Sequence, residues 1–376
     1  MIGIITPYNV ANYGTKLQAY AMQVMLEKYD QCEILGFVTS SDKRFGSLAG
    51  KIFNRVDRLF HRRKKIIETE NMRERKRGIN KFDKYYRVGA AIYGNKALEK
   101  EIKKYDSVVC GSDQLWAPLN VMADYTTMTL VPDNINKVSY AASFGVEMVP
   151  KYMEQKYRRY LSRINHISVR EEQGRILVEQ LADRKSKVVL DPTLMVEVNK
   201  WDELSQSSNI NIDEAYVFCY FLGTNKKHRE FAKKLADMCG MKLVTIPHFK
   251  EWNSADEGFG DIQLYNAGPV EFVSLIKNAK YICTDSFHGT VFSILFHKQV
   301  AVFERFNKND KESTNSRIYS LMEKLGISKQ LCEDESDVKK IVSEGIDYVS
   351  VEMKLQDLKK DSWEFLDNSL RGKEND

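Results

Sequence analysis

The sequence has little of what would mark a membrane-spanning or secreted protein. Its longest apolar runs, such as residues 215–222, are far shorter than the roughly 18 residues that cross a bilayer as a helix. Residues 1–7 lack the basic segment and the long apolar segment of a signal peptide, and they predict a first buried strand instead. We therefore expect a cytoplasmic protein.

Cysteine and histidine are also scarce. The six cysteines are scattered and include no C-x-x-C pair, the six histidines are dispersed, and no H-E-x-x-H motif occurs. Disulfide frameworks and structural zinc sites need patterned spacing of such residues, so we expect neither. We predict no metal site and no cofactor.

Positive charge is concentrated in one segment. The net charge is only +5, but residues 51–104 hold 18 Lys and Arg against 7 Asp and Glu. Such a segment suits nucleic acid, an anionic membrane surface or a solvated helical hairpin. No nucleic-acid-binding motif is present, so we expect no nucleic-acid partner. Phe53 and Phe60 among the basic residues favour a peripheral contact at the inner face of the membrane, and the solvated hairpin stays an alternative.

Strand-like runs alternate with helical patterns along most of the chain. Such alternation predicts parallel sheets joined by right-handed crossovers, and 376 residues are too many for one ordinary core. We predict an α/β protein with two Rossmann-like domains that face each other across a cleft. The expected parts are residues 1–192 as the first domain with a basic helical insert over about 42–104, 193–214 as the linker, 215–350 as the second domain, and 351–376 as a C-terminal helix and tail that packs on the first domain.

The most informative motif is Thr-Asp-Ser-Phe-His-Gly-Thr at residues 284–290, directly after the apolar run 281–283. This pattern predicts a strand, a tight turn and the start of a helix. Open α/β sheets bind ligands at such places, because free N–H groups and the helix dipole attract anions. A lone histidine is more often structural, but its position makes His288 a functional candidate together with Ser286 and Gly289.

Other candidates follow predicted strands. Arg170 comes directly after the strand 166–169 and can grip a carboxylate with two N–H groups or form a simple surface ion pair. Arg317 precedes a helical pattern and is a candidate for the same two roles. Asp113 follows the strand 108–110 and is either a base, a ligand contact or a helix cap. Residues 191–193, Asp-Pro-Thr, indicate a turn at the domain border.

These segments together resemble the polysaccharide pyruvyl transferase family. The resemblance rests on residues 12–21, 111–116, 139–145, 168–171, 190–193 and 284–289, in that order, within residues 1–330. It implies a GT-B-like fold and transfer of a pyruvyl group from phosphoenolpyruvate onto two hydroxyls of a sugar as a cyclic ketal. The acceptor would belong to a cell-surface polysaccharide or its precursor, either lipid-linked or nucleotide-linked, as in exopolysaccharide or capsule biosynthesis.

The resemblance and its chemistry imply roles for the candidate residues. His288 would protonate the methylene carbon of phosphoenolpyruvate, and Asp113 would orient or deprotonate an acceptor hydroxyl. Arg170 and Arg317 would hold the carboxylate and the phosphate of the donor. The other expected substrate-binding residues lie in predicted turns and helix starts: Ser286, Gly289, Asn12, Gly14 and Gln18.

Two other functions remain open from the sequence. A GT-B-type glycosyltransferase would use the same fold with a nucleotide sugar, since fold alone does not decide function. A non-catalytic glycan-assembly protein would bind anionic sugars through the basic insert and would not need His288.

Overall fold

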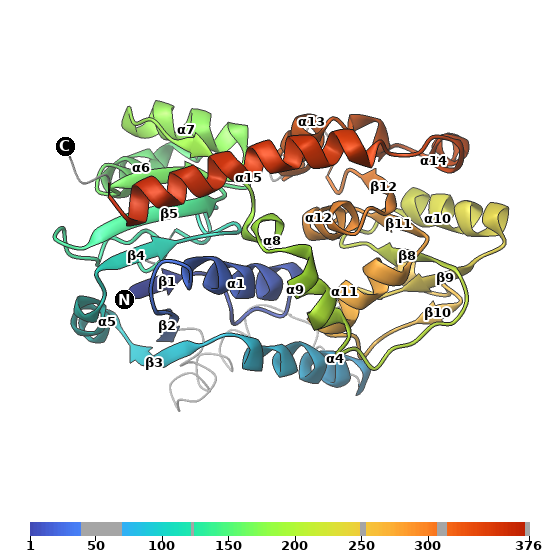
Figure 1. Ribbon diagram of the computed structural model, residues 1–376, viewed down its shortest axis with the longest axis horizontal. Coiled ribbons are helices and arrows are strands. Elements are labelled where there is room, and N and C mark those ends of the chain that lie inside the picture. Colours follow the sequence, from blue (N-terminus) through green and yellow to red (C-terminus); the bar gives the residue numbers. More distant parts are fainter. Residues whose placement is uncertain (39–69, 122–123, 249–252, 307–313, 373–376) are drawn as a thin grey trace, which may run out of the picture.

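A computed structural model describes residues 1–38, 70–121, 124–248, 253–306 and 314–372 (Figure 1). The strands form two sheets, and all pairings between neighbouring strands are parallel. The first sheet, in the order β3-β2-β1-β4-β5-β6-β7, contains β1 Ile2–Ile5, β2 Cys32–Val38, β3 Val88–Tyr93, β4 Ser107–Cys110, β5 Asn136–Ala142, β6 His166–Val169 and β7 Lys187–Val188. The second sheet, in the order β10-β9-β8-β11-β12-β13, contains β8 Tyr216–Tyr220, β9 Lys242–Thr245, β10 Ile262–Gln263, β11 Tyr281–Thr284, β12 Gln299–Phe303 and β13 Leu331–Cys332.

Helices connect the strands and cover the sheets. The α-helices are α1 Tyr13–Leu26, α4 Glu70–Asn80, α5 Asn95–Glu101, α6 Glu154–Leu161, α7 Glu172–Ala182, α8 Pro192–Met195, α9 Val198–Ser205, α10 Lys226–Cys239, α11 Pro269–Asn278, α12 Phe287–Leu295, α13 Ser316–Leu325, α14 Val338–Ser343 and α15 Tyr348–Leu370. β1, β4 and β8 are buried along their whole length, as expected for parallel strands covered on both faces. The predicted α/β class with two parallel sheets is confirmed.

One apolar cluster joins the two halves of the molecule. It includes Ile4 of β1 and Phe218 of β8, with Leu17 of α1, Phe272 of α11 and Phe292 of α12 between the sheets. Burial of apolar surface at about 25 cal/mol per Å² makes a continuous cluster of this kind the main attraction between the halves. The cluster therefore places α1, α11 and α12 between the two sheets.

The expected helical insert is only partly helical. Residues 39–69, including Phe53, Phe60 and the basic run 62–65, lie outside the described residues. The remainder contains α4 and α5, but also the strand β3, so an all-helical insert is wrong. β3 pairs with β2, and the two strands approach so closely that a Cβ on Gly36 would lie 2.7 Å from the carbonyl oxygen of Gly89. This pairing outweighs the weak strand preference of a sequence rich in glycine and alanine. The domain boundaries given above remain a prediction.

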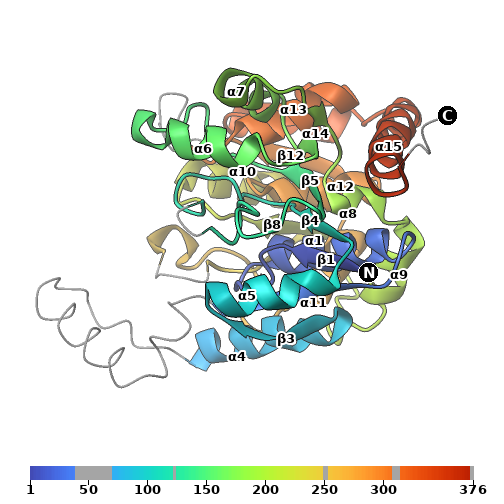
Figure 2. The ribbon, with the colours of Figure 1, turned by 90° about the vertical axis from the view of Figure 1, so that its left-hand side faces the viewer.

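Two helices reach from one half of the molecule to the other. α4 lies beside α11 at one edge, and α15 runs along the opposite edge (Figures 1 and 2). The α15 hydroxyl Ser362 Oγ accepts a hydrogen bond of 3.0 Å from the amide of Leu190, and Tyr29 donates one of 2.9 Å to Asp367. The expected C-terminal helix is therefore present and packs on the first sheet.

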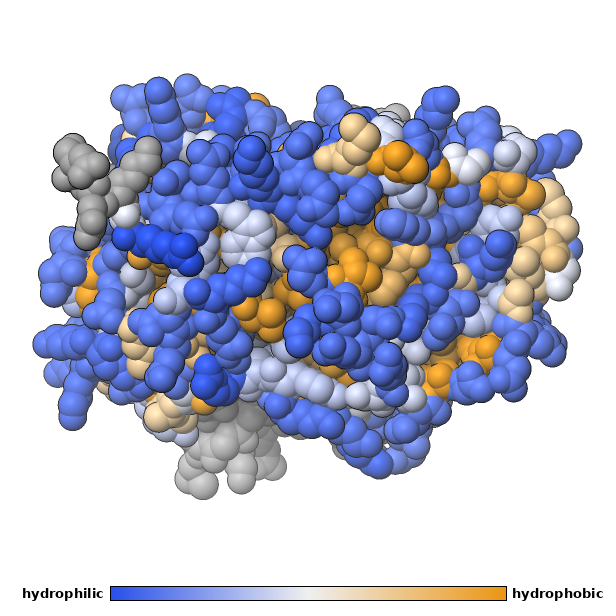
Figure 3. Space-filling view, viewed as in Figure 1, coloured by the Kyte–Doolittle hydropathy of each residue, from blue (hydrophilic) through white to orange (hydrophobic). Residues whose placement is uncertain are grey.

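The face that α15 crosses is largely hydrophilic, with separate apolar areas (Figure 3). Val349 and Met353 near the start of α15 are exposed. Among the described residues, no helix combines the length and the apolar character needed to cross a membrane.

Candidate active site

The turn between β11 and α12 is built as a tight polar corner. Ser286 is the N-cap of α12, and its hydroxyl accepts a hydrogen bond of 3.3 Å from the amide of Gly289. A Cβ on Gly289 would lie only 2.4 Å from Thr284 Oγ1, so the close approach requires glycine. Both residues therefore shape the turn that presents His288 in the first turn of the helix.

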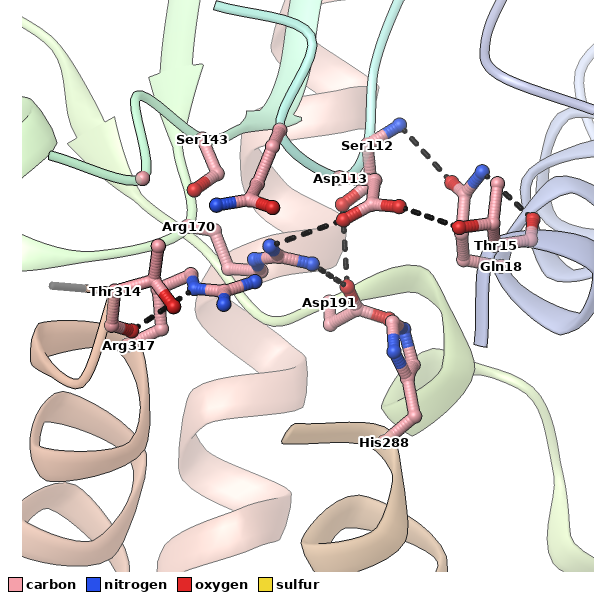
Figure 4. A network of polar contacts seen from close by, with 12 residues as sticks. Thr15, Gln18, Ser112, Asp113, Ser143, Arg170, Asp191, His288, Thr314 and Arg317 are labelled. Atoms are coloured by element: carbon pink, nitrogen blue, oxygen red, sulfur yellow. Dashed lines mark hydrogen bonds and ion pairs between the residues drawn. The ribbon is translucent and has the colours of Figure 1, made fainter. Parts of the chain in front are cut away.

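His288 lies where the two halves of the molecule meet (Figure 4). Its imidazole packs on Gly14 of α1 so tightly that a Cβ there would lie 2.1 Å from Nδ1. The residue is only 7% exposed, and Nε2 is 3.7 Å from Asp191 Oδ1, too far for a hydrogen bond. Within the part of the chain that the structure describes, Nε2 is buried without a hydrogen-bond partner. The imidazole is thus held in place by packing and faces a carboxylate.

Asp191 is the hub of the polar network. Its Oδ2 accepts hydrogen bonds from Arg170 Nη1 at 2.7 Å and from Ser112 Oγ at 3.2 Å. Its Oδ1 accepts two more from the amide and hydroxyl of Thr193, at 3.0 and 2.7 Å. Burial by itself would raise the pKa of Asp191, but the positive charges of His288 and Arg170 hold it well below its usual range. Asp191 is therefore a permanent negative charge beside the imidazole.

The sequence indicated only a turn at Asp191. It does form that turn, as the N-cap of α8 with Pro192 at the first helical position. The signal that it also belongs to the site was present, because it follows a predicted strand as Arg170 does and lies in one of the matching segments.

Asp113 joins the loop after β4 to both α1 and Arg170. Its Oδ2 accepts a hydrogen bond of 2.9 Å from Thr15 Oγ1, and its Oδ1 lies 3.5 Å from Arg170 Nη2. Its backbone has a φ of 66°, a left-handed conformation that aspartate tolerates better than most residues. Burial alone would raise the pKa of Asp113, but Arg170 and its charged neighbours lower it below the ordinary value. Asp113 is therefore ionised at neutral pH.

Two buried arginines flank one aromatic ring. The guanidinium carbon of Arg170 lies 4.5 Å from the centroid of Phe287, and that of Arg317 lies 5.9 Å from it. Arg317 Nε donates to the carbonyl oxygen of Thr314 at 3.2 Å, and within the described residues Arg317 forms no ion pair. Burial and the neighbouring Arg170 charge lower the pKa of Arg317 to about 9. Two buried like charges this close favour a bound anion.

Buried polar atoms that find no hydrogen-bond partner among the described residues surround the same place. They are Arg170 Nε, His288 Nε2 and Glu171 Oε2. Glu171 Oε1, by contrast, accepts hydrogen bonds from Ser143 Oγ at 2.9 Å and from the amide of Phe144 at 3.0 Å. Most buried polar groups in native proteins are paired, so a cluster of unpaired ones indicates a ligand site. Neither Glu171 nor Ser143 was among the predicted site residues, although both follow predicted strands and lie in matching segments, 168–171 and 139–145.

The remaining predicted site residues, Asn12 and Gln18, hold in place the elements that carry the site. Asn12 is the N-cap of α1 and accepts a hydrogen bond of 3.1 Å from the amide of Thr15. Gln18 is fully buried and donates to Thr6 Oγ1 at 2.9 Å, while its Oε1 accepts from the amide of Ser112 at 3.2 Å. Gln18 thus fixes the loop that carries Asp113 and does not reach the space between the arginines.

In the described ranges, no three His, Cys, Asp or Glu side chains come together as metal ligands would.

The class of protein follows from the fold and from solved structures that share it. A structure assigned as a UDP-N-acetylglucosamine 2-epimerase of Listeria monocytogenes is 8% identical, with 96% of this chain and 90% of that chain covered and a TM-score of 0.54. S. aureus MnaA, in a co-structure with UDP, is 14% identical over 99% and 97%, with a TM-score of 0.51. The E. coli ADP-heptose heptosyltransferase II is 12% identical over 96% and 99%, with a TM-score of 0.38. At such identities the likeness to the first two structures shows the fold alone, which is GT-B-like.

The family is more specific than the fold. The polysaccharide pyruvyl transferase family matches residues 12–305, most of the chain, and the chain therefore belongs to this family. None of the curated proteins matches the chain. Membership supports a transferase activity with a sugar or polysaccharide acceptor.

Proposed function

We propose that the protein transfers a pyruvyl group from phosphoenolpyruvate to two hydroxyls of a sugar and forms a cyclic ketal. The observation that carries the proposal is the pair of buried arginines around Phe287, next to His288 and Asp191 (Figure 4). Phosphoenolpyruvate carries a carboxylate and a phosphate on the same carbon, so one small molecule needs two cationic contacts. Family membership supports the same chemistry.

The arginines act as donor clamps. Arg170 is held in orientation by Asp191 and Asp113, which leaves its Nε for the donor. Arg317 has no ion pair among the described residues. Its pKa is lowered first by burial and then by the Arg170 charge, and a donor anion would offset both effects. Arginine suits carboxylate and phosphate because its planar donors match their oxygens. Ser286 and Gly289 add the amino end of α12 to the same positive environment.

His288 acts as the acid. Protonated His288 gives its proton to the methylene carbon of phosphoenolpyruvate, and the adjacent carbon becomes electron-poor. A sugar hydroxyl attacks that carbon and loses its proton, the C–O bond to phosphate breaks with the electron pair leaving on phosphate, and a second hydroxyl closes the ketal with loss of its proton. Asp191 stabilises the positive imidazolium before the proton is given. Of the two protons lost by the sugar hydroxyls, one returns His288 to its protonated form and the other is taken up by the departing phosphate.

Asp113 orients the acceptor in this proposal. Because its pKa is lowered, it is a weak base at neutral pH. It is better suited to accept a hydrogen bond from an acceptor hydroxyl than to remove its proton outright. Thr15 fixes the carboxylate for that purpose.

The acceptor belongs, in this proposal, to a cell-surface polysaccharide precursor. A lipid-linked precursor would lie at the inner face of the membrane, where the basic segment 42–104 would bring the protein. Exposed Arg73 and Arg77 of α4 belong to the described part of that segment. Their attraction to anionic lipid would be about 1 kcal/mol each.

Thermal unfolding with candidate donors tests the proposal. Phosphoenolpyruvate at about 100 times its Kd should stabilise the wild type by about 2.7 kcal/mol. Arg317→Gln should lose this response, whereas His288→Gln should keep most of it because His288 acts in the chemical step. Stabilisation by UDP-sugars alone would favour the glycosyltransferase alternative, and a sugar response that survives without any donor response would favour a non-catalytic glycan-binding protein.

A further inference from the structure

A separate cavity of about 200 Å³ lies between the two halves of the molecule. One side is formed by the carboxyl ends of β8, β9 and β12, and the other side by the loop before α1 and by α4. The carboxyl edge of a parallel sheet is where α/β proteins bind their ligands. Neither the donor clamps Arg170 and Arg317 nor His288 lines this cavity, so it is distinct from the site described above.

The cavity walls are aromatic and held rigidly. Tyr13 stacks on Phe272 with ring centroids 5.4 Å apart, and its hydroxyl donates to the carbonyl oxygen of Ala267 at 2.9 Å. Tyr220 packs edge-to-face on the same Phe272 at 4.9 Å. Such walls keep their shape in the absence of a ligand, which lowers the entropy cost of binding.

The charged residues that line the cavity are basic. Arg75 of α4 and Arg305 after β12 both line it, and no carboxylate is among its described lining residues. Arg305 Nη2 donates to the carbonyl oxygen of Asp285 at 3.1 Å, and its Nε has no hydrogen-bond partner in the described ranges. Asp285 itself lies 3.9 Å from Arg305 Nε and has both carboxylate oxygens committed to the amides of Leu222 and Gly223. Arg305 is therefore only partly neutralised and can hold an anion.

Two short segments of the chain link the residues that line the cavity to His288. Asn12 lines the cavity, and two residues further along Gly14 contacts His288. On the other side, Arg305 holds the carbonyl of Asp285, three residues before His288. A ligand in the cavity therefore lies beside the donor site.

We propose that this cavity binds the sugar ring of the acceptor, and that the ring or its first substituent carries a phosphate or a carboxylate that contacts Arg305. The inference rests on the proposed function. The volume is below the roughly 300–1,000 Å³ typical of pockets for drug-sized ligands, so one sugar ring fits and a whole nucleotide sugar does not. Aromatic walls suit the apolar face of the ring, and the arginine selects the anion.

Binding of matched sugars to the full chain tests this inference. The probes are the 1-phosphates, the uronic acids and the neutral methyl glycosides of glucose, galactose and mannose, titrated by calorimetry. At least one anionic sugar should bind, and Arg305→Gln should weaken it at least tenfold while Arg305→Lys restores much of the loss. Ala11→Phe, which fills the cavity, should weaken anionic and neutral sugars alike. The phosphate and uronate series distinguish the two sources of charge.

The donor response separates this inference from the proposed function. Both Ala11→Phe and Arg305→Gln should still be stabilised by phosphoenolpyruvate, which reports the clamp of Arg170 and Arg317. The proposal that this cavity binds the acceptor is refuted by either of two results obtained with a normal donor response. One is that no anionic sugar binds, and the other is that neither substitution changes the affinity for the sugars. If the wild type lacks the donor response, the proposed function fails whatever the sugars do.

Discussion

Arg317 carries a buried charge that its described neighbours do not neutralise. Burial and the nearby Arg170 charge lower its pKa from the ordinary arginine value to about 9, so the folded protein holds this proton less tightly than the unfolded chain does. The resulting cost to folding is fully present at pH below about 9 and disappears only as the pH rises towards the unfolded value. At about 1.4 kcal/mol per pKa unit, the cost is a few kcal/mol.

Replacing Arg317 should therefore stabilise the protein and destroy donor binding. Arg317→Met fills a similar elongated space without charge, so we expect a higher free energy of unfolding in urea at pH 7. The same variant should show no stabilisation by phosphoenolpyruvate. Arg317→Lys, which keeps the charge, serves as the control and should gain no stability. A less stable Arg317→Met protein that still responds to the donor would refute this view of the residue.

Gly14 and His288 should be coupled by direct contact. Gly14 occupies the second position of α1, where alanine would normally favour the helix. Here the added Cβ would displace the imidazole, which lies 2.1 Å from its position. We expect Gly14→Ala to reduce transfer at least tenfold with donor binding retained.

Free energies of unfolding for Gly14→Ala, His288→Ala and the double variant check the contact. Removal of the ring should relieve the clash, so the double variant should be more stable than the sum of the single effects predicts, by about 0.5–3 kcal/mol. Additive effects would mean that the two residues do not touch in solution.

Part of the site could be predicted from local sequence, and part could not. His288 and Arg170 follow strand-like runs, so their place at a sheet edge was visible in the pattern. That Asp191 faces His288 depends on how the two halves pack, because the residues are far apart in the chain. Gln18 lies in a matching segment and was predicted to bind substrate. Its side chain instead forms internal hydrogen bonds with Ser112 and Thr6, which the sequence pattern does not distinguish from a binding role.

At the scale of elements, α4 contacts the second half of the chain and stabilises its packing against the first half. Arg75 is buried, and its guanidinium donates to three backbone carbonyls of the second half, those of Tyr265, Leu264 and Pro247. Gly78 lies against the carbonyl oxygen of Asn266, where a Cβ would be 2.7 Å away. α4 therefore helps to set the distance between the sheets.

Arg75→Ala should destabilise the protein strongly. The carbonyl of Pro247 is left buried without this donor, at a cost of about 1–3 kcal/mol, and the two partly buried carbonyls add to it, so a loss of at least about 2 kcal/mol is expected in urea unfolding. Arg77→Ala is the matched control on the same helix, because Arg77 is 64% exposed and pairs only with Glu70 among the described residues. It should change stability by about 0.5 kcal/mol or less. Equal effects of the two substitutions on the free energy of unfolding would show that the hydrogen bonds of Arg75 do not stabilise the contact between the two halves.

Secondary structure was predictable where packing and local preference agree. The strand and the helix predicted around residues 281–290 are present as Tyr281–Thr284 and Phe287–Leu295, because a buried apolar run and the signals for a turn agree there. β3 was missed because its glycine and alanine residues give no strand signal, and only the pairing with β2 makes it a strand.

For the whole molecule, the site exists because the two sheets meet. Asp113, Arg170 and Asp191 come from the first half, and His288 and Arg317 come from the second (Figure 4). Alternating strands and helices were enough to predict two parallel sheets, since that order permits few other arrangements. The order of the strands and the shared apolar cluster were not predictable, because they depend on contacts between distant segments.

Transfer in D₂O tests the central claim most directly. Enzyme, phosphoenolpyruvate and the anionic sugars are incubated together, and phosphate release and the sugar product are followed by NMR. The account predicts phosphate release that requires both a sugar and His288, with an equal amount of ketal whose methyl group carries one deuterium. Phosphoenolpyruvate left intact while a UDP-sugar is consumed to form a glycoside would contradict it.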